Sequence, residues 1–302
     1  MSFRYDDIGN RLKAFRLASG LSADEIARQI GISRTALYRC EKGELTKIET
    51  LDKLSELLGV SIPSLLGVGI EFISSAVAYF ERLRQIEEEA QHIVVLAGPL
   101  SYLLASDGFD QVVEQILVES IPKDLRDRAR ALADVETILS ILKQRKTHYR
   151  QRRPSVVNLI SGLEIERLLR NGFIGRALLP HSEQEKRLQL ARAEVLHFAD
   201  LLAQQPIGVQ IGVVRDALPQ TGFQIFRTAE RRLLTLSPFR LGENPNVRVG
   251  VAMITSADEA LMLHDRAINE MWDSALKGQE ACAYLHDLVA ATDRTNRLRI
   301  AK

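Results

Sequence analysis

Between Leu21 and Gly43 lie the residues of this chain whose types and spacing best suit contact with a nucleic acid. The apolar pattern predicts two short helices separated at Gly31. Four polar side chains would lie on the exposed side of the second helix: Arg34, Thr35, Tyr38 and Arg39. An α-helix fits the major groove, and arginine can donate two hydrogen bonds to guanine. The spacing therefore predicts a helix that reads DNA bases.

Other residues of the same segment suit the phosphates beside the groove. Ser22 and Ser33 precede the two predicted helices and can cap them, and Glu25 completes a capping box with Ser22. Backbone N–H groups at such helix starts can donate to a phosphate. Two lysines after the second helix supply point charges. The candidate DNA-binding residues are Ser22, Ala23, Ser33, Arg34, Thr35, Tyr38, Arg39, Lys42 and Lys47.

This segment belongs to a run of five helices predicted between residues 8 and 66. A glycine follows the apolar pattern of three of these helices and is expected to end each helix; these glycines are Gly20, Gly31 and Gly59. Thr46 is predicted to open the fourth helix, and Pro63 suits the first turn of the fifth. Residues 1–67 are therefore predicted to form an all-α domain.

The five-helix segment resembles the Xre/Cro-type helix-turn-helix domain of phage repressors and many bacterial regulators. The matching residues are Leu21, Glu25, Ile26, Ala27, Gly31, Ile32, Ser33, Leu37, Glu41, Lys42 and Gly43, followed by Leu51, Leu54, Leu58, Gly59, Val60, Leu65 and Leu66. The resemblance implies double-stranded DNA as the partner and an ion pair between Arg16 and Glu41. That family often carries glutamine as a phosphate clamp where this chain has Ala23, so that only a backbone N–H is available there.

Residues 68–91 form the next predicted unit, a linker or dimerisation helix. The pattern from Gly69 to Gln91 is that of one continuous helix. Its apolar residues follow the 3,4,3 spacing of a short coiled-coil seam, and they are Ile73, Ala76, Phe80 and Leu83. Two interpretations remain open, namely a helix that pairs with a second copy and a helix packed on its own larger domain.

Residues 92–302 are predicted to form a larger α/β or α+β domain with a mixed sheet, which would sense an effector. Strands are expected at 92–97, 207–214, 223–226, 232–236 and 247–254. Helices are expected at 109–120, 122–150, 162–171 and 182–204, and one long helix is expected from Ser256 toward Ala291.

A cluster of basic residues lies between Lys143 and Arg153, at the end of one of these predicted helices. Two interpretations remain open for it: a solvated helix end, where cations are favoured, or a further contact with DNA or an acidic partner.

Several residues of this larger domain could hold a small effector. Ser101 and Tyr102 follow a strand end, where open α/β sheets commonly bind ligands. Arg215 also leaves a strand and could hold an anionic effector, such as a carboxylate or a phosphate. His264 and Trp272 lie on the predicted last helix. We therefore expect an effector pocket among Ser101, Tyr102, Arg215, His264 and Trp272.

The order of elements also resembles sensors built on a phospholipase-D-like fold. Their H-x-K-x-x-x-x-D motif is absent, because Arg266 and Met271 stand where the lysine and aspartate would follow His264. Phosphate-binding loops, dinucleotide loops, zinc-protease motifs and nucleophile elbows are absent too. We expect no cofactor, no metal and no catalysis. The alternative is a DNA-associated enzyme that acts on a nucleotide or phosphoester.

Composition limits how the chain could bind DNA. Residues 1–67 hold ten Lys or Arg and nine Asp or Glu, a net charge of +1. Phosphate attraction is therefore modest, and a homodimer would reinforce it.

The sequence shows neither a zinc site nor a membrane span. Cys40 and Cys282 have no zinc-ligand spacing, and no apolar run is long enough to cross a bilayer. The sequence thus predicts a cytoplasmic, effector-controlled transcription regulator without a membrane partner.

Overall fold

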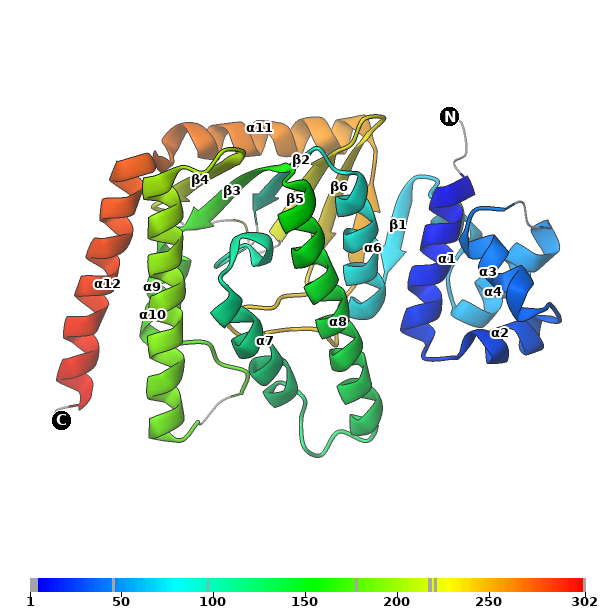
Figure 1. Cartoon of the computed structure of the whole chain (residues 1–302), viewed down its shortest axis with the longest axis horizontal. Coiled ribbons are helices and arrows are strands. Elements are labelled where there is room, and N and C mark those ends of the chain that lie inside the picture. The colour runs from blue at the N-terminus through cyan, green and yellow to red at the C-terminus, as the bar shows by residue number, and fades with distance from the viewer. Residues whose placement is uncertain are drawn as a thin grey trace.

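The computed structural model describes residues 5–44, 47–96, 98–176, 179–216, 219 and 222–300. A helical N-terminal domain lies at one end of the molecule, far from the C-terminus (Figure 1). Its helices are α1 (Tyr5–Ser19), α2 (Ala23–Ile30), α3 (Arg34–Glu41), α4 (Ile48–Leu58) and α5 (Ile62–Leu66). The five predicted helices are confirmed. Thr46, the predicted start of the fourth helix, lies outside the described residues.

Local sequence signals explain the boundaries of α2. The Ser22 side chain accepts a hydrogen bond from the Glu25 N–H, and the Glu25 carboxylate accepts one from the Ser22 N–H at 2.8 Å. The helix ends at Gly31, whose φ of 76° favours glycine. Helices of this domain bury a shared apolar core that includes Leu12, Ile26 and Leu37.

The larger domain is built on an eight-stranded mixed sheet with the order β1-β7-β6-β5-β2-β3-β4-β8. Its strands are β1 (Ile70–Ile73), β2 (His92–Leu96), β3 (Ser155–Ser161), β4 (Val209–Val214), β5 (Gly222–Arg227), β6 (Arg232–Ser237), β7 (Ala252–Thr255) and β8 (Leu276–Lys277). Strands β2, β3 and β4 pair in parallel, and the other pairings are antiparallel. The prediction of a helical domain followed by a larger α/β domain with a mixed sheet is confirmed.

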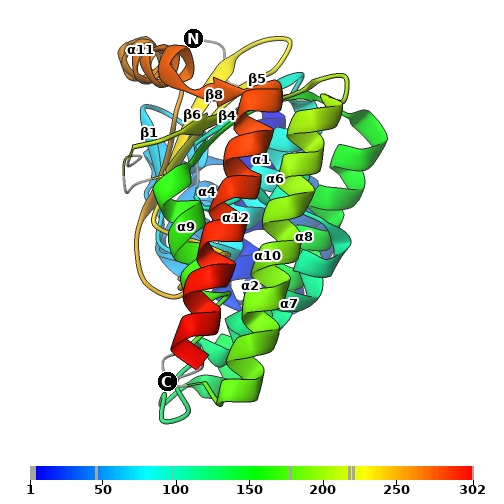
Figure 2. The same cartoon turned by 90° about the vertical axis from the view of Figure 1, so that its left-hand side faces the viewer.

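Helices cover both faces of this sheet. They are α6 (Ala76–Glu89), α7 (Asp107–Glu119), α8 (Arg128–Arg152), α9 (Gly162–Asn171), α10 (His181–Gln204), α11 (Asp258–Ser274) and α12 (Gly278–Ile300), together with the 3-10 turn η1 (Tyr102–Leu104). One face packs on α11, where Leu261 and Ile268 meet Phe223 and Leu234 of the sheet. The other face shares its core with α6, α8 and α10, and α10 and α12 lie side by side (Figure 2).

The continuous helix predicted from Gly69 to Gln91 is wrong at its start. Ile70–Ile73 is strand β1, which pairs antiparallel with β7, and only Ala76–Glu89 is helical. This short strand carries apolar residues on both of its faces, because Phe72 is exposed while Ile73 is buried. The segment therefore lacks the apolar–polar alternation that would distinguish a strand from a helix. Helix α6 buries Ala76, Phe80 and Leu83 within the chain, so this helix packs on its own larger domain.

The larger domain differs from the prediction in three further ways. Strand β3 was not expected, because it follows a long basic helix after only two residues. The long helix from Ser256 is two helices, α11 and α12, which β8 separates by pairing with β4. The strand expected at 247–254 is confined to Ala252–Thr255.

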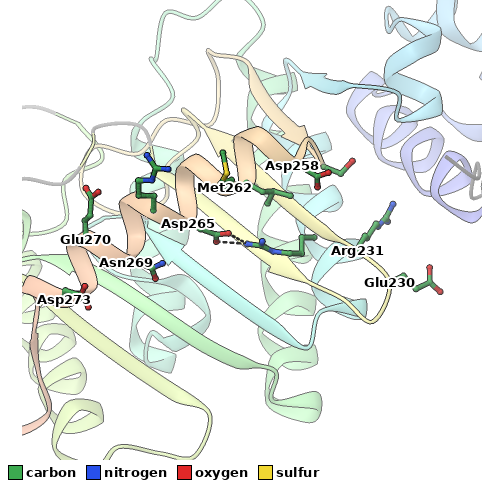
Figure 3. Close-up of a pocket in the computed structure, with 12 residues that line it drawn as sticks. Glu230, Arg231, Asp258, Met262, Asp265, Asn269, Glu270 and Asp273 are labelled. Carbon is green, nitrogen blue, oxygen red and sulfur yellow. Dashed lines mark hydrogen bonds and ion pairs between the residues drawn. The ribbon is translucent and has the colours of Figure 1, made fainter.

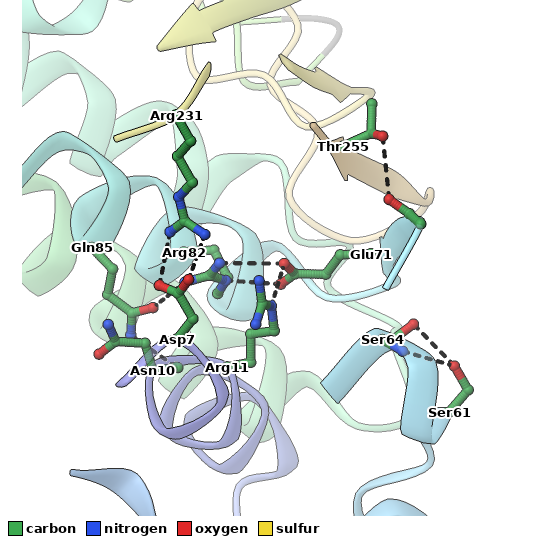
Figure 4. Close-up of polar contacts among 11 residues, drawn as sticks. Asp7, Asn10, Arg11, Ser61, Ser64, Glu71, Arg82, Gln85, Arg231 and Thr255 are labelled. Carbon is green, nitrogen blue, oxygen red and sulfur yellow. Dashed lines mark hydrogen bonds and ion pairs between the residues drawn. The ribbon is translucent and has the colours of Figure 1, made fainter. Parts of the chain in front are cut away.

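A buried polar network joins the two domains (Figure 4). Arg11 of α1 and Arg82 of α6 both donate to the carboxylate of Glu71, at 3.0 and 2.8 Å. Arg82 also donates to Gln85 at 2.6 Å, and Gln85 donates to the Asn10 carbonyl at 3.0 Å. Burial alone would raise the pKa of Glu71, but the two guanidiniums lower it below its ordinary value.

Replacing Glu71 should weaken this junction strongly. Glu71→Gln keeps the shape but leaves two buried guanidiniums without their shared anion, which should cost about 3 kcal/mol of unfolding free energy in urea titrations. Glu166→Gln is the matched control because its ion pair with Arg170 lies at the surface and is partly exposed. Its cost should stay below about 0.5 kcal/mol. Equal losses in the two variants would contradict the role given to Glu71.

Candidate nucleic-acid interface and ligand cavity

Helix α3 presents the predicted reading residues to solvent. Arg34, Thr35, Tyr38 and Arg39 are all exposed, whereas Leu37 and Cys40 of the same helix are buried in the domain core. The exposed side thus carries two guanidiniums, a hydroxyl and a phenol. These groups can reach base edges if the helix enters a major groove.

The two arginines of this surface contact acids of their own domain. Arg34 donates to Asp24 at 3.1 Å and to the Tyr38 hydroxyl at 3.2 Å. Arg39 pairs with Glu44. These side chains are well exposed, and exposed pairs of this kind are weak. Nucleic-acid groups could therefore replace them at small cost.

The remaining candidates lie around this surface. Ser22 and Ser33 cap their helices, and Ser33 accepts a hydrogen bond from the Ala36 N–H at 3.1 Å. Lys42, at the C-cap of α3, and Lys47, at the N-cap of α4, are both exposed. The side chain of Ala23 is buried, so that only its backbone could face a phosphate.

The ion pair implied by the family resemblance is confirmed. Arg16 of α1 donates to Glu41 at the end of α3, with its Nη2 atom 3.1 Å from Oε2. The Arg16 guanidinium also lies 5.9 Å from the ring centre of Tyr38. Arg16 thus fixes α3 against α1 directly beneath the exposed reading surface.

A cavity of about 500 Å³ opens at the carboxyl end of β2 in the larger domain. Two of the residues expected to hold an effector, Ser101 and Tyr102, line it. Parallel and antiparallel neighbours meet at β2, which pairs with β3 on one side and β5 on the other. Ligands of open α/β sheets commonly bind at such a carboxyl edge.

Two side chains from the basic run at residues 143–153 are buried, contrary to a solvated helix end. Arg145 lines the cavity and donates to Glu87 of α6 at 2.8 and 2.7 Å. Lys146 donates to Asp110 at 3.0 Å. Their partners come from α6 and α7, far away in sequence, so local charge patterning could not predict this burial.

Three other predicted effector residues lie away from this cavity. Arg215 is exposed and lies 3.8 Å from Glu280. His264 contacts Phe223 on the face of the sheet that α11 covers, with ring centres 4.7 Å apart. Trp272 lies on the same helix, with the Lys277 ammonium 5.1 Å from its ring. The cavity instead includes residues that the sequence did not single out, among them Glu164, Gln224 and Arg240.

An open groove of about 810 Å³ runs along α11 (Figure 3). Arg232 of β6 donates across it to Asp265 at 2.6 Å. Arg231 lies at one end of the groove and donates to Asp7 of α1 at 2.7 Å. This groove therefore reaches the junction between the domains, and its lining holds more acidic than basic side chains.

Metal-binding clusters and membrane-spanning helices are both absent from the described residues. These residues contain no group of three or more His, Cys, Asp or Glu side chains placed to hold a metal ion. In the same part of the chain, no helix is both long and apolar enough to span a membrane.

Comparison with known proteins supports the assignment of the N-terminal domain. Residues 12–65 match the family described as HTH_3: Helix-turn-helix. The comparison with curated proteins finds no match. None of these findings supports the phospholipase-D-like resemblance of the larger domain.

A solved structure described as "Structure of TrmBL2, an archaeal chromatin protein, shows a novel mode of DNA binding" aligns with this chain. The alignment has 12% identity and a TM-score of 0.31, and it covers 75% of this chain. The chain matches only 61% of that protein's length. A likeness of this degree shows neither a shared site nor a shared function.

Loss of the α3 cap should destabilise the N-terminal domain. Ser33→Ala removes the acceptor for the Ala36 N–H and should cost about 1 kcal/mol of unfolding free energy. Thr35→Ala on the same helix is the control, because its exposed side chain caps nothing, and its effect should stay within about 0.5 kcal/mol. Urea unfolding followed by circular dichroism would measure both. A Ser33→Ala variant as stable as the control would refute the cap's contribution.

Proposed function

We propose that this protein is a DNA-binding transcription regulator whose α3 helix reads an operator and whose larger domain responds to a small effector. The exposed reading surface of α3 within a matched helix-turn-helix domain carries the first half of this proposal. Its arginines can contact guanine, while Lys42 and Lys47 can contact phosphates.

A second copy of the chain is part of the proposal. The N-terminal domain has a net charge of only +1, so that one copy gains little from phosphate attraction. Two copies on a two-fold symmetric operator would add their contacts through a high effective concentration. The proposal therefore expects homodimers on DNA.

Helix α6 supports the effector half of the proposal because it contacts both the cavity and the N-terminal domain. Tyr79, Phe80 and Leu83 line the cavity. Arg82 and Gln85, on another side of the same helix, belong to the junction with α1. A ligand that favours one position of α6 would thereby bias the position of the reading helix.

The proposal assigns ligand binding rather than catalysis to the larger domain. The alternative, a DNA-associated enzyme acting on a nucleotide or phosphoester, predicts turnover by the purified protein. Sustained hydrolysis of a phosphodiester that is lost on mutation of the cavity would favour that alternative.

Two substitutions on the reading surface should affect DNA binding differently. Arg34→Ala should reduce the preference for the specific site by about 1–3 kcal/mol, because a base contact is lost. Lys42→Ala should weaken binding to the specific site and to bulk DNA equally, because a phosphate contact is lost. The slope of log affinity against log salt concentration should fall by about 1. Fluorescence anisotropy at several fixed salt concentrations, with fragments upstream of the gene, would measure both.

The matched control is Lys123→Ala, which removes an exposed lysine from the larger domain. Its affinity and salt slope should equal those of the unmodified protein. If full-length protein shows no preference for any upstream fragment over bulk DNA, then the operator-reading proposal is wrong.

Effector control makes a prediction that follows from thermodynamic linkage. A metabolite that raises the melting temperature of the full-length protein through the cavity should change its DNA affinity. The same factor must then describe the effect of DNA on metabolite affinity. Calorimetric titration of metabolite with and without DNA would measure this factor. A cavity ligand that leaves the DNA affinity unchanged would contradict effector control.

A further inference from the structure

The cavity at the carboxyl end of β2 contains a carboxylate oxygen without a partner. Glu164 belongs to the first turn of α9, and its Oε2 atom is buried and accepts no hydrogen bond. A Cβ atom added to Gly98 would lie 1.5 Å from this oxygen, so the glycine leaves the room that the carboxylate occupies. An unsatisfied buried acceptor is costly, and a ligand that draws the Glu164 carboxylate away from Gly98 and donates to it would remove that cost.

The second carboxylate among the described residues that line the cavity already has donors. Glu243 accepts from Arg167 at 2.8 Å and from Asn171 at 3.0 Å. Arg145, the most buried cation of the lining, donates twice to Glu87. Arg145 and Arg167 are therefore neutralised by carboxylates, which leaves these two poorly suited to hold an anionic ligand, whereas Arg240, the third cation of the lining, is exposed.

The charges around Glu164 come from several elements. Burial raises the pKa of its carboxyl, Arg167 and Arg240 lower it, and Glu243 raises it further, so that the pKa lies above its ordinary value. The ionised form is thus held at some cost here. A cation placed beside Glu164 would favour that form.

Aromatic side chains provide the apolar wall. Tyr79 lies with its ring centre 5.6 Å from that of Phe80 and 5.8 Å from that of Phe239, and all three line the cavity. The volume of about 500 Å³ suits a small organic molecule. Aromatic walls also tolerate a cationic group on their faces.

We propose that this cavity binds a small organic amine whose protonated amino group donates to Glu164 and whose apolar body lies against Tyr79, Phe80 and Phe239. The inference rests on the proposed effector control, and it reverses the anionic ligand that Arg215 suggested. It names the chemical class of the effector, a compact ammonium ion with a flat or branched hydrocarbon part.

Three probes with the same hydrocarbon body test the charge that the cavity prefers. Phenethylamine, phenethyl alcohol and hydrocinnamate would be titrated by calorimetry into the full-length protein without DNA. The amine should bind at least about tenfold more tightly than either of the other two, because only it brings a cationic donor to the carboxylate. Equal affinities, tighter binding of the acid, or no binding of the amine would overturn the proposal.

Glu164→Gln is the decisive variant, because it keeps the shape of the side chain and removes its charge. The preference for the amine should disappear, while Glu166→Gln on the same helix should retain it in full. The melting temperature without ligand would show that both variants fold. Retained preference for the amine in a folded Glu164→Gln protein would overturn the role of Glu164.

The pH dependence gives an independent readout. Protons and the amine compete for the same carboxylate, so amine affinity should fall by up to about tenfold per pH unit below the pKa of Glu164. The amine affinity of Glu164→Gln should not change with pH over that range, and a parallel fall in both proteins would overturn the proposal.

Failure of this inference can be distinguished from failure of the proposed function. Amine binding without any change in DNA affinity would defeat effector control alone, whereas DNA reading without amine binding would defeat this inference alone.

Discussion

The carboxylate of Glu71 holds guanidiniums from both domains, Arg11 from α1 and Arg82 from α6. All three side chains are buried, so removing Glu71 would leave two guanidiniums without the carboxylate that they share. This shared carboxylate sets the position of α1 relative to the sheet domain. Because Arg16 and Glu41 in turn fasten α3 to α1, the orientation of the reading surface depends on this junction.

Helix α6 gives the junction its link to the cavity. Its buried residues face two different neighbours, since Phe80 lines the cavity while Arg82 belongs to the polar network. Packed helices move as units rather than bending continuously. In the proposed regulator, a ligand against Phe80 would therefore act on Arg82 without any additional moving part. The groove along α11 contacts α1 through Arg231 and Asp7, so a second connection runs on the other face of the sheet.

Signals that act over a few residues made the N-terminal domain predictable. Ser22 with Glu25 and the stop at Gly31 define α2 without help from distant residues. The mixed sheet was also predictable, but strand β1 was not, since its apolar residues match helical spacing over so short a segment. The cavity was predictable only at Ser101 and Tyr102. Glu164 and Arg145 belong to different helices, and only the packing of α8 and α9 beside β2 brings them to one site.

The acids beside the reading arginines bear on how this domain would choose DNA. Asp24 and Glu44 pair with Arg34 and Arg39, so that two exposed cations carry little long-range field. Bulk DNA offers mainly phosphate charge, and the acids of these local pairs would compete with the phosphates for the two arginines. A matching base edge offers directed acceptors, which replace each lost pair with hydrogen bonds of defined geometry. The cost of breaking these weak pairs is small, but hydrogen bonds to a correct site offset it better than bulk phosphate does, so the pairs would favour discrimination slightly at the expense of total affinity.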